Sequence, residues 1–105
     1  MHTEIPTCAL DPEGMRVQKQ RYGRLGADVL RVRREPEALV IEFRDGFDRD
    51  TLQEALAVER ECCPFFLFDL DEEARRLRAS VRERDQLPAL EAIAHALGHQ
   101  VSTKR

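Results

Sequence analysis

The sequence predicts an α+β domain: a single two-layer sandwich with helices packed on one face of a four-stranded, mainly antiparallel sheet. Stretches with the 3.6-residue apolar spacing of helices alternate with stretches whose apolar residues recur at every second position. The elements follow in the order α-β-β-α-β-β-α, which groups the strands into two hairpins. The chain has 105 residues, 42% of them hydrophobic, which suffices for one core and leaves no room for two.

The first helix is predicted from its start signal. Asp11 is a suitable N-cap, and Pro12 fits the first helical position. The helix extends to about Leu25, and Gly26 stops it. We expect three of its side chains to be buried: Met15, Tyr22 and Leu25.

A β-hairpin is predicted to follow. Residues 29–33 and 38–44 have strand composition, and Pro36 lies in the turn between them. In the second strand Leu39, Ile41 and Phe43 alternate with Val40 and Glu42, which indicates one buried and one solvated face.

The second helix carries an unexpected charge. Its N-cap is Asp48, and its apolar face is formed by Leu52, Ala55, Leu56, Cys62 and Cys63. Glu59 falls on that same face. We expect the helix to end near Cys62 or Cys63, because Pro64 moves the preceding residue away from helical angles.

The second hairpin and a last helix complete the domain. Strands are predicted over residues 65–70 and 76–82, with an acidic turn between them, and the last helix extends from Pro88 to Leu97. The sequence therefore divides into an N-terminal extension (1–10), a single α+β domain (11–98) and a polar C-terminal tail (99–105).

Composition excludes several classes of protein. Seventeen Lys and Arg against 20 Asp and Glu give a net charge of −3, so no nucleic-acid partner is expected. The longest apolar run, residues 65–68, is far shorter than the roughly 20 residues of a membrane helix, and no secretory signal is expected. Three cysteines are too few for a disulfide framework, so we expect a cytoplasmic protein.

The stretch Glu59-Arg60-Glu61-Cys62-Cys63-Pro64-Phe65 combines acidic and thiol groups in an unusual way. With it, the chain resembles a family of small uncharacterised bacterial proteins that carry the pattern Glu-x-x-Cys-Cys-Pro-Phe before a strand. Cys8 in Cys8-Ala9-Leu10 and Arg21 late in the first helix match further parts of that pattern. The resemblance implies no established activity, but it implies that Glu59, Cys62, Cys63 and Cys8 belong to one pattern.

The position of the cysteine pair favours a soft cation over a reactive thiolate. A helix C-terminus and nearby carboxylates oppose a thiolate and favour a bound positive ion. If the N-terminal segment packs over this helix end, Cys8 completes a three-sulfur site with Cys62 and Cys63, as three reduced thiols in the absence of metal. Cu(I), Hg(II) and As(III) are the candidates; Zn(II) fits least well, because its structural sites use spaced ligands.

The cysteines, Glu59 and the other candidate residues also have purely structural interpretations. Cysteine is often a buried core residue, and Glu59 is expected to be buried in an ion pair, with Arg21 as the preferred partner. His95 and His99, and the arginines of residues 76–84, are expected to be solvated.

Three functions therefore remain. The first is binding of a soft metal or metalloid through the vicinal cysteines, for sensing, buffering or transfer. The second is a non-catalytic protein-interaction or homodimerisation domain with structural buried cysteines, which meets its partner through the exposed part of the sheet or the edge strand near Val29. The third is a thiol redox enzyme, which is disfavoured because the position of the pair opposes a low thiol pKa.

Overall fold

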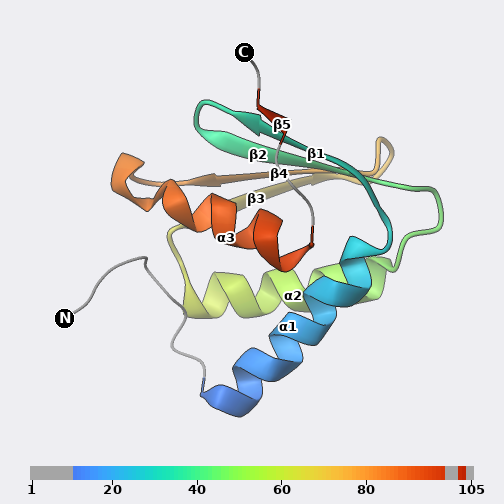
Figure 1. Cartoon of the computed structure of the whole chain (residues 1–105), viewed down its shortest axis with the longest axis horizontal. Coiled ribbons are helices and arrows are strands. Elements are labelled where there is room, and N and C mark those ends of the chain that lie inside the picture. Colours follow the sequence, from blue (N-terminus) through green and yellow to red (C-terminus); the bar gives the residue numbers. More distant parts are fainter. Residues whose placement is uncertain (1–10, 99–101, 104–105) are drawn as a thin grey trace.

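A computed structural model describes residues 11–98 and 102–103. Three helices and a mixed sheet follow one another in the predicted order, which is confirmed (Figure 1). The elements are α1 (Pro12–Gly26), β1 (Val29–Glu35), β2 (Ala38–Phe43), α2 (Arg49–Cys62), β3 (Phe66–Asp71), β4 (Arg76–Val81), a 3-10 turn η1 (Arg84–Gln86), α3 (Pro88–Ala96) and β5 (Ser102–Thr103).

The strands of the sheet lie in the order β3-β4-β2-β1-β5. The first four pair antiparallel: β1–β2 and β3–β4 form the two predicted hairpins, and β2 pairs with β4 between them. The short strand β5 is a difference from the prediction of a polar tail over residues 99–105. It pairs parallel to β1 at Arg33 and Arg34 only, so the first half of β1 keeps a free edge within the described residues.

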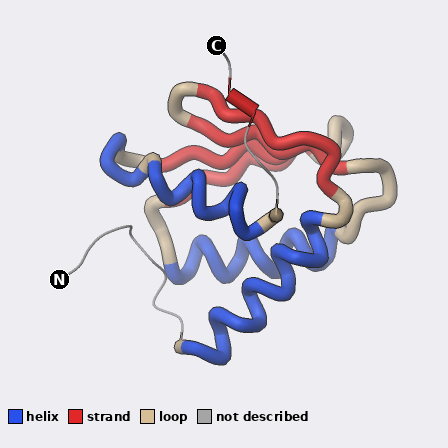
Figure 2. The backbone as a smooth tube through the Cα atoms, in the orientation of Figure 1, coloured by secondary structure: helices blue, strands red, loops and turns tan. Residues whose placement is uncertain are grey.

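All three helices lie on one side of the sheet, which confirms the two-layer arrangement (Figures 1 and 2). Helices α2 and α3 contact the strands, and α1 packs against α2 and α3. In the described part of the chain, no helix has the length and apolar character needed to span a membrane.

Two expectations about burial are wrong. Met15 is 54% exposed, because the first turns of α1 extend away from α2 (Figure 1). Val40 lies on the solvent side of β2 and is nevertheless only 2% exposed. It is central in the sheet, with Arg33 of β1 and Arg78 of β4 as its neighbours in register, and their long side chains can cover it.

The open face of the sheet carries a lattice of ion pairs. On it Glu42 is paired with Arg31 and Arg33, and Glu35 is paired with Arg33 and Arg78. These residues come from three neighbouring strands, β1, β2 and β4. Of the solvated basic face expected for β4, Arg78 is thus paired with an acidic side chain of β1.

The junction between α1 and α3 depends on a glycine. A Cβ atom on Gly26 would overlap the backbone carbonyl of Leu97. Gly26 therefore ends α1 at a point of close approach to the end of α3, and Ala27 is the C-cap.

Candidate functional site

The candidate site lies at the C-terminal end of α2. The helix begins at the Asp48 cap, whose side chain accepts a hydrogen bond from the backbone N–H of Thr51 at 3.1 Å. It ends at Cys62, as predicted, and Cys63 is the C-cap with φ −131° and ψ 73°. Pro64 accounts for this end, because the residue before a proline is driven out of the helical region.

The two neighbouring cysteines are in different states. Cys62 is a free, half-buried thiol. Cys63 is only 3% exposed, belongs to the hydrophobic core and is disulfide-bonded. The expectation of three reduced thiols is therefore wrong for Cys63. Cys8, the third cysteine of the predicted set, lies outside the described residues.

Glu59 is buried, as its place on the apolar face of α2 predicted. Its side chain is 6% exposed, and its backbone carbonyl accepts a hydrogen bond from the N–H of Cys63 at 2.7 Å. Two side chains of α1 donate to the carboxylate oxygen Oε2: the hydroxyl of Tyr22 at 2.7 Å and the Nε2 amide of Gln18 at 3.0 Å. Gln18 Nε2 also lies 3.0 Å from the carbonyl of Ala55. A buried polar cluster thus joins α1 to the last turns of α2.

The predicted direct pairing of Arg21 with Glu59 is replaced by a relay. The Arg21 Nη1 group donates to Gln18 Oε1 at 2.9 Å, and Gln18 in turn donates to Glu59. Arg21 Nε lies 3.6 Å from the carboxylate of Glu54, so its ion pair is with that residue. Tyr22 and Gln18 lie four residues apart on the buried face of α1, whereas Arg21 lies at the flank of that face.

The cluster has an electrostatic consequence for Tyr22. Burial, and then the negative charge and hydrogen bond of Glu59, raise the pKa of the Tyr22 phenol well above its ordinary value. The phenol is therefore a neutral donor to the carboxylate at every physiological pH.

Sequence reasoning missed Tyr22 and Gln18 as members of this cluster. The spacing of apolar residues predicts the burial of Tyr22 but gives no sign of its polar role. The position of Gln18 could have indicated its burial, because it lies four residues before Tyr22 and so on the same face of the helix. A buried amide on such a face requires hydrogen-bond partners.

The other candidate residues are not brought to this site. His95 is exposed on α3, and His99 lies outside the described residues. In residues 11–98 and 102–103, no group of three or more His, Cys, Asp or Glu side chains is arranged to hold a metal ion. A three-sulfur site thus depends on Cys8 and stays a prediction.

Comparisons with family models, with curated proteins and with solved structures find no match to this chain. The resemblance to the family with the Glu-x-x-Cys-Cys-Pro-Phe pattern therefore stays a prediction that rests on the motif alone.

Proposed function

We propose that the C-terminal end of α2 is a thiol site that binds a soft metal ion or metalloid when its cysteines are reduced. The observation that carries the proposal is the contrast between the disulfide-bonded Cys63 and the free Cys62 beside it. A disulfide requires another sulfur at bonding distance, so sulfur atoms converge at this helix end.

We propose Cys8 as the second half of that bond. The sequence has three cysteines, and Cys62 is free, which leaves Cys8 for Cys63. An adjacent pair is also a poor disulfide, because consecutive Cα atoms lie only about 3.8 Å apart. On this proposal, reduction by a cellular thiol yields three cysteine thiols around one helix end, while the reducing thiol is oxidised to its own disulfide.

Three converging thiols suit a trigonal thiophilic species. Arsenous acid and three thiols condense to an arsenic tris-thiolate with release of three waters, without any change of oxidation state. Hg(II) and Cu(I) are also soft acceptors for thiolates, and Zn(II) remains the weakest fit because the set lacks a fourth ligand. The negative end of the α2 dipole favours a bound cation and opposes a free thiolate. The site therefore fits binding better than nucleophilic catalysis.

Binding is tested on reduced protein under anaerobic conditions, with arsenite as the probe and free thiols counted by DTNB. We expect one free thiol in the oxidised chain, three after reduction, and protection of all three by one equivalent of arsenite. Cys62→Ser, Cys63→Ser and Cys8→Ser should each weaken arsenite binding at least tenfold, since a site with two thiols loses one As–S bond.

Peptide mapping without reduction tests the bonding partner separately. We expect a peptide linked through Cys8 and Cys63, with Cys62 alkylated. Reduced protein that leaves arsenite unbound, or serine variants that bind it as well as the parent chain does, would contradict the proposal. The interaction domain with structural cysteines would then be the better function. Turnover of a disulfide substrate that depends on Cys62 would instead favour the thiol redox enzyme.

A further inference from the structure

Strand β3 lies at one end of the sheet, with β4 on one side and no described strand on the other. The backbone N–H of Arg82 donates to the carbonyl of Phe65 at 3.0 Å, so the backbone polar groups of Phe65 are directed to β4. Because an antiparallel ladder alternates, the backbone groups of Phe66 and Phe68 are then directed to the free edge. The N–H of Phe66 is already bonded to the carbonyl of Cys63 at 3.1 Å, which leaves Phe68 with both groups available.

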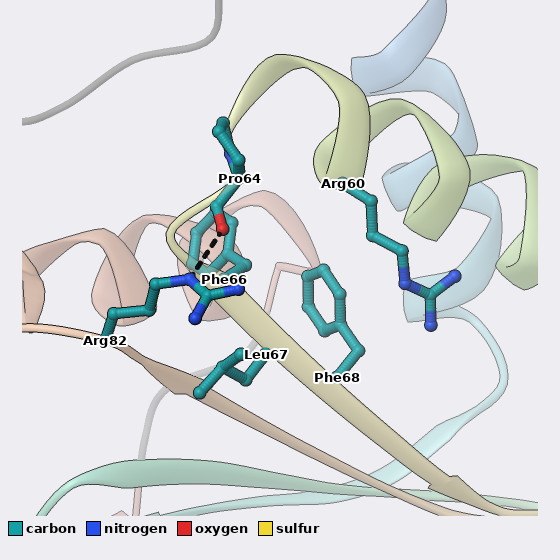
Figure 3. Close-up of a pocket in the computed structure, with 6 residues that line it drawn as sticks. All are labelled: Arg60, Pro64, Phe66, Leu67, Phe68 and Arg82. Carbon is teal, nitrogen blue, oxygen red and sulfur yellow. Dashed lines mark hydrogen bonds between the residues drawn. The ribbon is translucent and has the colours of Figure 1, made fainter.

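A hollow of about 400 Å³ lies along this free edge. It is lined by Arg60, Pro64, Phe66, Leu67, Phe68 and Arg82 (Figure 3). Successive residues of a strand point to opposite faces of the sheet, so a hollow lined by three consecutive strand residues wraps around the edge itself. Leu67, on the open face, is 42% exposed.

Two arginines flank the hollow. In Figure 3, Arg60 and Arg82 lie on opposite sides of the rings of Phe66 and Phe68. The guanidinium carbon of Arg60 lies 5.7 Å from the centroid of the Phe68 ring, and Arg82 Nε donates to the carbonyl of Pro64 at 3.1 Å. Within residues 11–98, neither arginine is ion-paired with a carboxylate, whereas the arginines of the open sheet face at positions 31, 33 and 78 are.

We propose that the free edge of β3 binds an extended acidic segment of a partner protein, which joins the sheet as a further strand. Its backbone pairs with Phe68, its apolar side chains enter the hollow beside the rings of Phe66 and Phe68, and its carboxylates approach Arg60 and Arg82. The far end of β3 carries Asp69 and Asp71, which repel acidic side chains. The acidic residues of the partner therefore lie towards the Phe66 end of the strand.

The test measures fluorescence anisotropy of the full chain with a labelled peptide of alternating valine and glutamate. We expect saturable binding that weakens as salt is added. Arg60→Ala and Arg82→Ala should each lower the affinity about fivefold, as expected for the loss of one exposed charged contact. Arg16→Ala is the matched control, because Arg16 is an exposed arginine of α1 that is ion-paired with Glu13. It should leave the affinity unchanged.

Two further peptides separate strand addition from simple attraction of charge. A version with lysine in place of glutamate should not bind. A version N-methylated at alternate residues loses the backbone donors of one edge and should bind at least tenfold more weakly.

The proposal is overturned if the alternating peptide does not bind, or if the N-methylated version binds as tightly. It is also overturned if benzoate competes at the same concentration as the peptide, since the hollow would then take a small carboxylate. A dimer in analytical ultracentrifugation that dissociates in Arg82→Ala would overturn it as well, in favour of a second copy of this chain at the β3 edge.

Discussion

Two glutamates with opposite surroundings show how this protein uses charge. Glu59 is 6% exposed and accepts hydrogen bonds from the Tyr22 hydroxyl and the Gln18 amide of α1. Glu42 lies on the open face of the sheet with a side chain that is 24% exposed, and both of its oxygens lie 3.2 Å from Arg31 Nη2. One carboxylate connects two helices inside the molecule, and the other joins strands at the surface.

The two carboxylates differ in the groups that take the place of water around them. A buried carboxylate has lost its hydration, so its donors must be fixed in place, and a buried donor without a second acceptor is left unsatisfied once the carboxylate is removed. An exposed carboxylate keeps water as an alternative partner, and dissolved salt screens its attraction to arginine. The same residue type should therefore have very different effects on stability at the two positions.

The largest effect is expected for Glu59→Ala. The change leaves the Tyr22 hydroxyl and the Gln18 amide without their common acceptor in a buried site, and it leaves a cavity. We expect the free energy of unfolding to fall by about 3 kcal/mol, measured by urea denaturation.

Glu59→Gln is the control for Glu59→Ala. It keeps the side-chain volume and one carbonyl acceptor while removing the charge, and it should cost less than half as much. Equal losses for the two variants would mean that the charge itself, rather than the acceptor, holds the cluster together.

Tyr22→Phe removes one donor from the same cluster and should have the second largest effect. A hydrogen bond to a charged acceptor contributes about 1.5–3 kcal/mol, so we expect a loss towards the lower end of that range, because Gln18 still donates to Glu59. Urea denaturation gives the value. A loss below about 0.5 kcal/mol would show that the buried cluster is no stronger than the surface lattice.

The raised pKa of Tyr22 predicts a loss of stability in alkali. In the unfolded chain this phenol ionises at about pH 10, whereas in the folded protein it stays protonated to higher pH. Above pH 10 the unfolded state therefore binds fewer protons than the folded state, and the free energy of unfolding falls as pH rises. The stabilisation that comes from the raised pKa of Tyr22 is fully present below pH 10.

Tyr22 is the single tyrosine of the chain, which also has no tryptophan, so its ionisation can be followed directly. The ultraviolet absorbance of tyrosinate should appear together with the loss of helical circular dichroism, not before it. Ionisation of Tyr22 in a chain that remains folded near pH 10 would contradict the buried hydrogen bond. Tyr22→Phe should lose less stability above pH 10 than the parent chain does.

Much of the fold follows from local pattern. The caps Asp11 and Asp48 and the period-two strands predict the observed elements, because each of these signals acts within a few residues. β5 could not be predicted in this way, since a two-residue strand has no periodicity and depends on pairing with β1. Val40 shows the same limit, because its neighbours in register, Arg33 and Arg78, come from other strands.

The sequence predicts where the candidate site lies, but not which side chains contact one another there. The position of Glu59 among apolar residues predicts its burial, and Pro64 predicts the helix end. A buried charge suggests an opposite charge, which favours Arg21 as the partner of Glu59, yet the α1 side chains that donate to it directly are Tyr22 and Gln18. The disulfide of Cys63 could not be predicted from helical spacing, which indicates only which side chains share a face of α2.

The smallest effect is expected at the surface carboxylate. Glu42→Ala should lower the free energy of unfolding by less than about 1 kcal/mol, because water can solvate Arg31 and Arg33 once the acid is gone. A double-mutant cycle with Arg31→Ala isolates the pair, and its coupling energy should be about 0.5 kcal/mol in low salt and smaller in 1 M salt. Arg33, but not Arg31, is the neighbour of Val40 in register and can cover it, so Arg33→Ala should cost more than Arg31→Ala through lost apolar cover. A coupling energy above about 2 kcal/mol that salt does not reduce would mean that the lattice is shielded from water, and Glu42 would then belong with Glu59 as a buried charge.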